Sequence, residues 1–243
     1  MAQLLFLTGA GMSAESGIPT FRDALTGLWA RFDAERLATE AAFRRDPALV
    51  WGWYRWRAAQ LREVQPHAGH RAIAELAARH DVAVVTQNVD DLHERAGSRD
   101  VVHLHGHLLR SRCIGCGAEV APDPIVQPPA PPADGAAEPP PRCARCGDLF
   151  RPGVVWFGEA LPEAAWQRAQ QAIAECERVV VVGTSGLVQP AASLPALARA
   201  LGRHVLEINP QRSAISDVAH EHWPLAASVG LGRLQEIFAA NDL

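Results

Sequence analysis

Four cysteines form two C-x-x-C pairs, Cys113 with Cys116 and Cys143 with Cys146, on either side of a proline-rich stretch. Two such pairs can place four thiolates tetrahedrally around one Zn²⁺. A chain that carries them must fold back so that segments distant in sequence meet at one metal. The spacing therefore predicts a small zinc-binding module inserted in a larger domain.

The N-terminal segment favours a cytoplasmic location, which bears on the chemistry of the cysteines. Residues 1–9 (MAQLLFLTG) lack a basic flank and turn glycine-rich, so we expect a buried strand and not a signal peptide. No apolar stretch has the length of a membrane span, and we expect no membrane partner. Disulfides are rare in the cytoplasm, so the cysteine pairs favour metal binding, and Cys176 is expected to lie in the core.

The charge of the chain argues against a nucleic-acid partner. The 243 residues include 23 basic and 27 acidic side chains, and the net charge is -4. Proteins that bind nucleic acids concentrate positive charge in order to displace counterions. Every basic side chain counted here is arginine, so the protein cannot be acylated on lysines of its own.

Apolar runs of strand length alternate with alanine-rich helical segments, and this pattern is typical of a parallel sheet covered on both faces. The expected strands are residues 4–8, 82–86, 179–183 and 205–208. The expected helices are residues 47–63, 70–79, 163–175 and 195–201. Residues 122–141 are rich in proline and lack periodicity, so we expect an extended loop between the cysteine pairs. The fold class predicted is α/β, doubly wound and Rossmann-like.

Glycines follow the first expected strand directly, at Gly9, Gly11 and Gly17. Glycine there lets the backbone approach a pyrophosphate, whose charge amide groups at a helix start can meet. The spacing departs from the G-x-G-x-x-G pattern of dehydrogenases, which disfavours hydride transfer. Nucleotide binding and a tight turn between strand and helix both remain open on the glycines alone.

Polar residues follow the second expected strand, at Gln87, Asn88 and Asp90. This position is the carboxyl edge of a parallel sheet, where ligands bind in such folds. The alternative is that Asn88 and Asp90 only cap a helix.

Six motifs in this order resemble those of the sirtuins, the NAD-dependent protein deacylases. They are residues 9–22 (GAGMSAESGIPTFR), 86–93 (TQNVDDLH), 103–106 (HLHG), 154–159 (VVWFGE), 183–185 (GTS) and 208–210 (INP), with the cysteine pairs between the third and fourth. The resemblance spans nearly the whole chain, from Leu5 to about Ala227.

The resemblance implies NAD as co-substrate. Asn88 and Asp90 would line the nicotinamide pocket, with Asp90 accepting from the carboxamide. The residues implied in cofactor binding are Gly9, Ala10, Gly11, Ser13, Ser16, Pro19, Phe21, Arg22, Gln87, Asn88, Val89, Asp90, Gly183, Thr184, Ser185, Asn209, Pro210, Gln211 and Ala227.

The histidine motif supplies the general base that the resemblance implies, His105. His103, His105 and His107 alternate as metal ligands on a strand would, but Gly106 breaks the strand pattern and the cysteines already form a complete zinc set. In the implied reaction the acyl-lysine oxygen attacks the nicotinamide ribose, nicotinamide leaves, and neutral His105 takes a proton from the ribose hydroxyl that captures the acyl carbon. Water completes a reaction that yields lysine, nicotinamide and O-acyl-ADP-ribose, and the single Zn²⁺ is structural.

Substrates implied by the resemblance are acyl-lysine proteins or peptides, held by strand addition. Tyr54 and Arg57 stand three apart on one helical face, like the pair by which class III sirtuins recognise succinyl- or malonyl-lysine, and deacetylation would be weaker. The alternative is an amphipathic aromatic helix with a solvated arginine. The residues implied in substrate binding are Ala38, Tyr54, Arg57, Val155, Phe157, Gly158, Glu159, Gly186, Leu187 and Val188.

Three regions are expected along the chain. Residues 1–24, 64–107 and 156–243 would form the NAD-binding domain, residues 25–63 a helical segment for the acyl pocket, and residues 108–155 the zinc module. Two other functions are compatible with these motifs, a protein mono-ADP-ribosyltransferase that uses the same cofactor and a zinc-bearing scaffold that only binds acyl-lysine.

Overall fold

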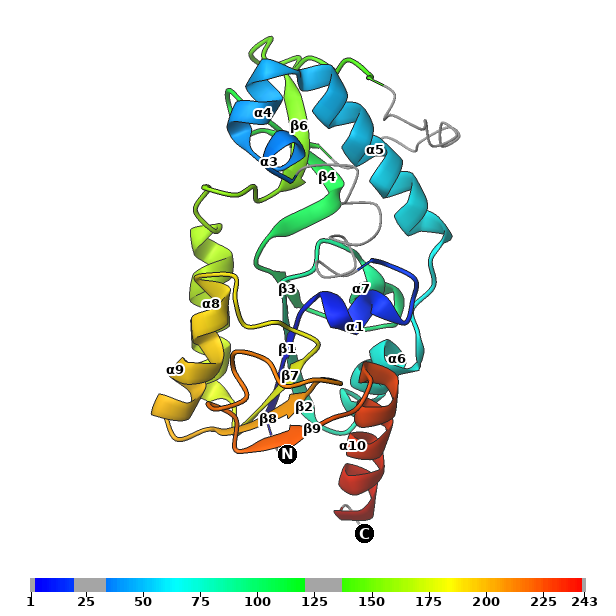
Figure 1. Ribbon diagram of the computed structural model, residues 1–243, viewed down its shortest axis with the longest axis vertical. Helices are drawn as coiled ribbons and strands as arrows, with labels where there is room; N and C mark the ends of the chain where they lie inside the picture. The colour runs from blue at the N-terminus through cyan, green and yellow to red at the C-terminus, as the bar shows by residue number, and fades with distance from the viewer. Residues whose placement is uncertain (1–2, 20–33, 121–136, 242–243) are drawn as a thin grey trace. The chain divides into compact units, whose positions relative to one another are not determined.

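The computed structural model describes residues 3–19, 34–120 and 137–241, and the chain divides into two compact units (Figure 1). The six-stranded unit comprises Met1–Thr20, Gln65–Leu104 and Pro162–Leu243. The cysteine unit comprises Phe21–Val64 and His105–Leu161. None of the helices in the described residues has the length and apolarity of a membrane span.

The six-stranded unit is a parallel sheet in the order β3-β2-β1-β7-β8-β9. Its strands are β1 (Gln3–Thr8), β2 (Asp81–Thr86), β3 (Val101–His103), β7 (Arg178–Val182), β8 (His204–Ile208) and β9 (Glu221–Trp223). Its helices are α1 (Ala10–Ala14), α6 (Ala68–Leu76), α7 (Leu92–Arg95), α8 (Glu163–Glu175), α9 (Leu194–Ala200) and α10 (Ala227–Asn241), with a 3-10 turn η2 (Ala191–Ser193) before α9.

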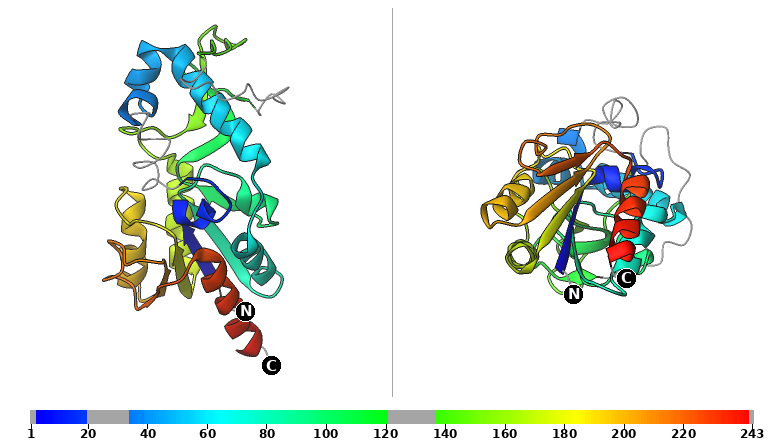
Figure 2. Two further views of the ribbon diagram at one scale, coloured as in Figure 1. Left: turned by 45° about the vertical axis from the view of Figure 1, so that its right-hand side comes forward. Right: turned by 90° about the horizontal axis from the view of Figure 1, so that it is seen from below.

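Helices cover both faces of this sheet because its central strands are apolar on both sides. Leu4 and Phe6 of β1 pack in one core with α6 and α10, while Leu5 and Leu7 point to the opposite face, on the side of α8 and α9. Figure 2 shows the two helix pairs on opposite sides of the strands. The doubly wound parallel fold predicted from the sequence is confirmed.

The predicted elements agree with the structure within a few residues. The helices predicted at residues 47–63 and 163–175 have those bounds. The helix predicted at residues 70–79 is displaced, because α6 begins at Ala68, where the His67 ring caps the helix by accepting from the Gly69 N–H (2.9 Å), and ends at Leu76. Cys176 is buried after α8, as expected, and its thiol lies 3.4 Å from the Ile173 carbonyl.

Three histidines pack together inside the six-stranded unit. The His70 ring centroid lies 4.3 Å from that of His67 and 5.0 Å from that of His93. His70 is fully buried, and neither of its ring nitrogens has a hydrogen-bond partner among the described residues. Burial, followed by the neighbouring His93, His67 and Arg71, lowers the pKa of His70 to about 2, and burial lowers the pKa of His93 to about 4.

These two histidines make the unit sensitive to acid. Since the folded state keeps the rings neutral while the unfolded chain takes up protons near pH 6.5, stability is present above that pH and is lost as the pH falls toward the folded pKa values. Each histidine contributes a slope of up to about 1.4 kcal/mol per pH unit in that window. His70→Leu should remove one such slope from the free energy of unfolding, measured by urea denaturation between pH 5 and 7.5.

A His70→Leu protein whose free energy of unfolding keeps the wild-type slope between pH 5 and 7.5 would contradict the burial argument.

In its described residues, the cysteine unit combines three helices with a small antiparallel sheet in the order β5-β4-β6. Its elements are α3 (Ala34–Leu37), α4 (Glu40–Arg45), α5 (Pro47–Glu63), β4 (Gly106–Cys113), β5 (Glu119–Val120) and β6 (Phe150–Val154). The long helix α5 starts sharply because Asp46 accepts from the Leu49 N–H (3.0 Å) and Pro47 occupies the first turn. Trp51 of α5 packs on Cys113, Cys143 and Phe150 and forms a small core with them.

Candidate functional site

In the six-stranded unit, the strand order reverses between β1 and β7, which is where ligands bind in open parallel sheets. The loops after these strands touch: the Gly11 N–H donates to the Gly183 carbonyl (2.8 Å) and the Gly9 N–H to the Val182 carbonyl (3.0 Å). Gly183 has φ +62, and a Cβ there would lie 2.4 Å from the Met12 nitrogen. Only glycine therefore allows the two loops to approach each other so closely.

Buried polar side chains connect the end of β2 to α1. Asn88 donates through Nδ2 to the Gly9 carbonyl (3.1 Å) and to Ser13 Oγ (3.0 Å). Ser13 in turn donates to Asp90 Oδ2 (2.9 Å). Burial raises the pKa of Asp90, against the lowering effect of its hydrogen bonds from Ser13 and Leu92. The network brings together three of the predicted cofactor residues, Ser13, Asn88 and Asp90, and holds the side chains of Asn88 and Asp90 in place.

His103 supports the same loop from outside the network. Its Nδ1 lies 3.0 Å from the Asn88 carbonyl and its Nε2 lies 2.7 Å from Glu94 Oε1. Burial, the largest single effect, lowers the pKa of His103, but the bond to Glu94, the Glu94 charge, the Asn88 carbonyl and the Asp90 charge together outweigh it, and the pKa is raised. Both ring nitrogens are thus engaged within the unit.

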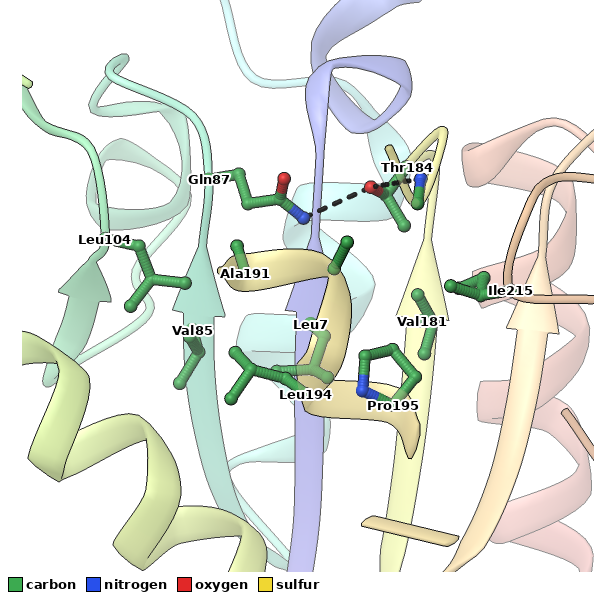
Figure 3. Close-up of a pocket in the computed structure, with 12 residues that line it drawn as sticks. Leu7, Val85, Gln87, Leu104, Val181, Thr184, Ala191, Leu194, Pro195 and Ile215 are labelled. Atoms are coloured by element: carbon green, nitrogen blue, oxygen red, sulfur yellow. Dashed lines mark hydrogen bonds between the residues drawn. The ribbon is translucent and has the colours of Figure 1, made fainter. Parts of the chain in front are cut away.

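A small cavity lies below the sheet edge, and Figure 3 shows its lining. Gln87 donates through Nε2 to Thr184 Oγ1 (3.1 Å) above the apolar side chains of Leu7, Val85 and Val181. The cavity has a volume of about 10 Å³, which is roughly what a single water needs. Asn209 Nδ2 donates to the Thr184 carbonyl (2.9 Å), so the ends of β2, β7 and β8 are tied together by side chains that the sequence predicted for the cofactor.

The four cysteines of the two pairs converge in the cysteine unit, with all four Sγ atoms within 4.8 Å of one another. The two pairs have the same backbone pattern: the Gly117 N–H donates to the Cys113 carbonyl (3.0 Å), and the Gly147 N–H donates to the Cys143 carbonyl (2.7 Å). Cys113 Sγ lies 3.4 Å from Cys146 Sγ, and Cys116 Sγ lies 3.7 Å from Cys143 Sγ. Sulfurs bound tetrahedrally to Zn²⁺ at about 2.3 Å would lie about 3.8 Å apart, so this donor set fits zinc.

His105 lies in the turn between β3 and β4, and Gly106 is the first residue of β4. The strand pattern is thus broken beside Gly106, as the sequence predicted. Gly106 has φ +75, and a Cβ on it would lie 2.2 Å from the Gly153 carbonyl oxygen. The His105 carbonyl accepts from the Val155 N–H (2.8 Å). The proposed base and the proposed peptide-binding segment after β6 are therefore joined through the backbone.

Predicted acyl-pocket residues also meet in the cysteine unit. The Ala38 carbonyl accepts from the Phe157 N–H (2.9 Å). On α5, the guanidinium of Arg57 lies over the rings of Trp53 (4.9 Å to the centroid) and Tyr54 (5.7 Å). Tyr54 is buried, whereas Arg57 is half-buried. The helix therefore brings a phenol and a guanidinium side by side, as their spacing predicted.

Other predicted residues fall into three groups. Gly186, Leu187 and Val188 follow β7, and Leu187 is 70% exposed. Pro210 and Gln211 follow β8, and Ala227 is the first residue of α10. The backbone N–H of the next residue, Ser228, donates to Glu15 Oε2. Phe21 and Arg22 lie outside the described residues. The prediction did not single out Trp156 or Arg151, although Trp156 stands inside the motif at residues 154–159.

Comparison with known proteins gives consistent matches over this chain. Residues 9–190 match the family model described as Sir2 family. NAD-dependent protein deacylase 1 of Pseudomonas aeruginosa is 58% identical over 213 residues, which is 86% of this chain and 83% of that protein. NAD-dependent protein deacylase 2 of Pyrobaculum aerophilum is 52% identical over 230 residues, 94% of this chain and 88% of that protein.

Solved structures match the whole chain as well. The crystal structure of a Sir2 homolog–NAD complex has a TM-score of 0.88 at 43% identity and covers 98% of this chain and 90% of its own. A Sir2–p53 peptide–NAD+ complex has a TM-score of 0.78 at 28% identity, with coverage of 98% and 94%.

Proposed function

Since this chain belongs to the Sir2 family and is an NAD-dependent protein deacylase, we propose that it preferentially removes acidic acyl groups, succinyl or malonyl, from lysine. The observation that carries the preference is the pairing of Tyr54 and Arg57 on one face of α5. Acyl-lysine proteins are the proposed partners, in line with the peptide complex of a structural relative.

The proposed cofactor site is the reversal point of the sheet. NAD, when bound, supplies a ribose carbon from which nicotinamide leaves. The glycine loops after β1 and β7 meet at this point, where the pyrophosphate is proposed to bind, and Asn88 and Asp90 are held by Ser13 in the place proposed for the carboxamide. On the glycine spacing alone, a tight turn is the alternative to nucleotide binding. The buried hydrogen-bond network of Asn88 and Asp90 favours nucleotide binding.

His105 is the proposed general base. Its neutral imidazole would take a proton from the ribose hydroxyl, and its position is supported by the Val155 bond and by the turn at Gly106. Val155 and Phe157 are proposed to line the channel for the lysine stem, and the segment that contains them is tied to Ala38. The four thiolates are proposed to hold one structural Zn²⁺, because they leave no open position for water.

The acidic preference follows from what each acyl group can offer. A guanidinium forms two parallel bonds to a carboxylate, and a tyrosine hydroxyl adds a third donor. The methyl group of acetyl-lysine offers no acceptor to either side chain, so it gains nothing from Arg57.

Arg57→Met tests the preference directly. Removing one charge-assisted contact should cost about 1.5–3 kcal/mol in transition-state binding of a succinyl peptide, or about one to two decades in kcat/KM. Turnover of the acetyl peptide should change little. The measurement is a panel of acetyl-, malonyl-, succinyl- and glutaryl-lysine peptides with NAD, in which free lysine and acylated ADP-ribose are quantified by mass.

Arg55 provides the matched control on the same helix. Its guanidinium nitrogen pairs with Glu138 (3.3 Å), so Arg55→Met removes an arginine without touching the Tyr54 pair. This variant should keep the wild-type ratio of succinyl to acetyl turnover. Equal losses on both substrates in Arg57→Met would refute the carboxylate role.

A further inference from the structure

A buried hydrogen bond joins the side chains of Trp156 and Tyr54 in the cysteine unit. The Trp156 indole Nε1–H donates to the Tyr54 hydroxyl oxygen (3.1 Å) over a sequence separation of 102 residues. Both side chains are buried, with 2% of Trp156 and 4% of Tyr54 exposed. The bond therefore forms in a water-poor environment, where its direction matters most.

The direction of this bond is determined by chemistry. An indole nitrogen can only donate, so the Tyr54 oxygen must accept from it and the phenol proton must point elsewhere. Among the described residues, Trp156 is the one hydrogen-bond partner of that hydroxyl. Burial, the largest effect, raises the pKa of Tyr54, so the hydroxyl keeps its proton. A buried donor that lacks an acceptor is unfavourable until a ligand brings one.

Trp156 is itself held firmly in place. The buried guanidinium of Arg151 lies over its ring (3.4 Å to the centroid), and the Phe43 ring lies 5.4 Å away. Glu159 pairs with Arg151 and also accepts from the Trp156 backbone N–H (2.8 Å). The indole N–H thus has one orientation, toward Tyr54.

We propose that Trp156 is a positioning residue that makes Tyr54 a hydrogen-bond donor toward an acceptor at the tip of the acyl group. The inference rests on the proposed acidic-acyl preference and deepens it, because it separates two contributions. Arg57 supplies charge, whereas Tyr54, oriented by Trp156, supplies a neutral donor that any terminal carbonyl oxygen satisfies.

Trp156→Phe removes the indole N–H and keeps an aromatic ring beside Arg151. The test uses three lysine peptides, carrying succinyl, its terminal amide, or acetyl. For both the carboxylate- and the amide-tipped peptides, KM should rise about 3- to 10-fold with kcat unchanged. Acetyl kinetics should stay at the wild-type values. Arg57→Met, by contrast, should affect the carboxylate-tipped peptide far more than the amide-tipped one.

Two further variants separate orientation from general damage. Tyr54→Phe should raise KM for the same two peptides, and adding Trp156→Phe to it should cause no further rise. Trp56 lies on α5, as Tyr54 does, and its indole Nε1 has no hydrogen-bond partner among the described residues. The Trp56→Phe variant should therefore have the wild-type KM for all three peptides. Thermal melting verifies that each variant is folded.

The outcomes are distinguishable. Equal losses for acetyl and succinyl peptides in Trp156→Phe, or a fall in kcat alone, would overturn the inference in favour of a packing role. A succinyl-preferring wild type whose Trp156→Phe variant is unchanged would overturn the inference and leave the proposed function intact. A wild type without any preference would overturn both. If Trp156→Phe does not fold, Tyr54→Phe decides, because an unchanged succinyl KM there would contradict a donor role.

Discussion

His105→Ala should lower kcat for both succinyl and acetyl peptides by about 10²- to 10⁴-fold, the range that general-base catalysis contributes. The proposed base would act on a ribose hydroxyl of NAD, which is the same whichever acyl group the peptide carries, so both peptides should lose the same factor. This equality contrasts with the selective effect of Arg57→Met. Steady-state kinetics with both peptides measures the two factors in one experiment.

The stage at which His105 acts supplies a second readout. In the proposed mechanism, proton transfer from the hydroxyl follows the departure of nicotinamide, so exchange of labelled nicotinamide into NAD should survive better than formation of acylated ADP-ribose. His107 lies two residues away in β4, where its Nδ1 accepts from the Leu109 N–H (3.1 Å). His107→Gln should retain turnover, and a His105→Ala enzyme that turns over normally would eliminate His105 as the base.

Loss of the metal should unfold the cysteine unit. Structural zinc contributes about 10–16 kcal/mol in small zinc-binding peptides, which is as large as the whole stability of a typical domain, about 5–15 kcal/mol. Cys143→Ala removes a proposed zinc ligand whose side chain also belongs to the small core with Trp51 and Phe150. Zinc content by mass spectrometry and hydrogen exchange of β4 and β6 should both report the loss, while β1 and β2 remain protected.

Cys176 provides the control for this experiment. It is buried in the six-stranded unit and is not a member of the four-cysteine cluster, so Cys176→Ala should keep one zinc per chain and the exchange protection of β4. A Cys143→Ala protein, or a chelator-treated wild type, that retains native protection in β4 would show that the metal is not structural.

Local patterns in the sequence predicted the large sheet well. The central strands β1 and β7 contain continuous apolar runs, Leu4 to Leu7 and Val179 to Val182, which mark a sheet covered on both faces. Helix α5 has its predicted bounds, and Asp46 and Pro47 are strong signals for its start. The start of α6 was misplaced because a histidine ring caps it, and histidine is not among the usual capping residues. The sequence did not predict the pairing of β4 with β6, because the residue pattern of one strand does not show which strand it pairs with.

The candidate site divides in the same way. Residues that belong to contiguous motifs, such as Asn88 and Asp90, could be found from the sequence. The contact between Trp156 and Tyr54 could not, because it depends on how two segments far apart in the chain pack. The stacking of Arg151 on Trp156 was missed for a related reason, as buried arginine is uncommon and nothing in its sequence neighbours marks its burial.

Strand β4 begins next to His105 and ends at Cys113, one of the four clustered thiolates. A zinc ion bound there would anchor one end of a strand whose other end carries the imidazole, although the ion touches no reactant. The fraction of chains loaded with zinc would then determine the fraction with an aligned imidazole. Specific activity of a preparation would consequently measure its zinc loading, and two preparations could differ in rate while every active molecule in them works at the same speed.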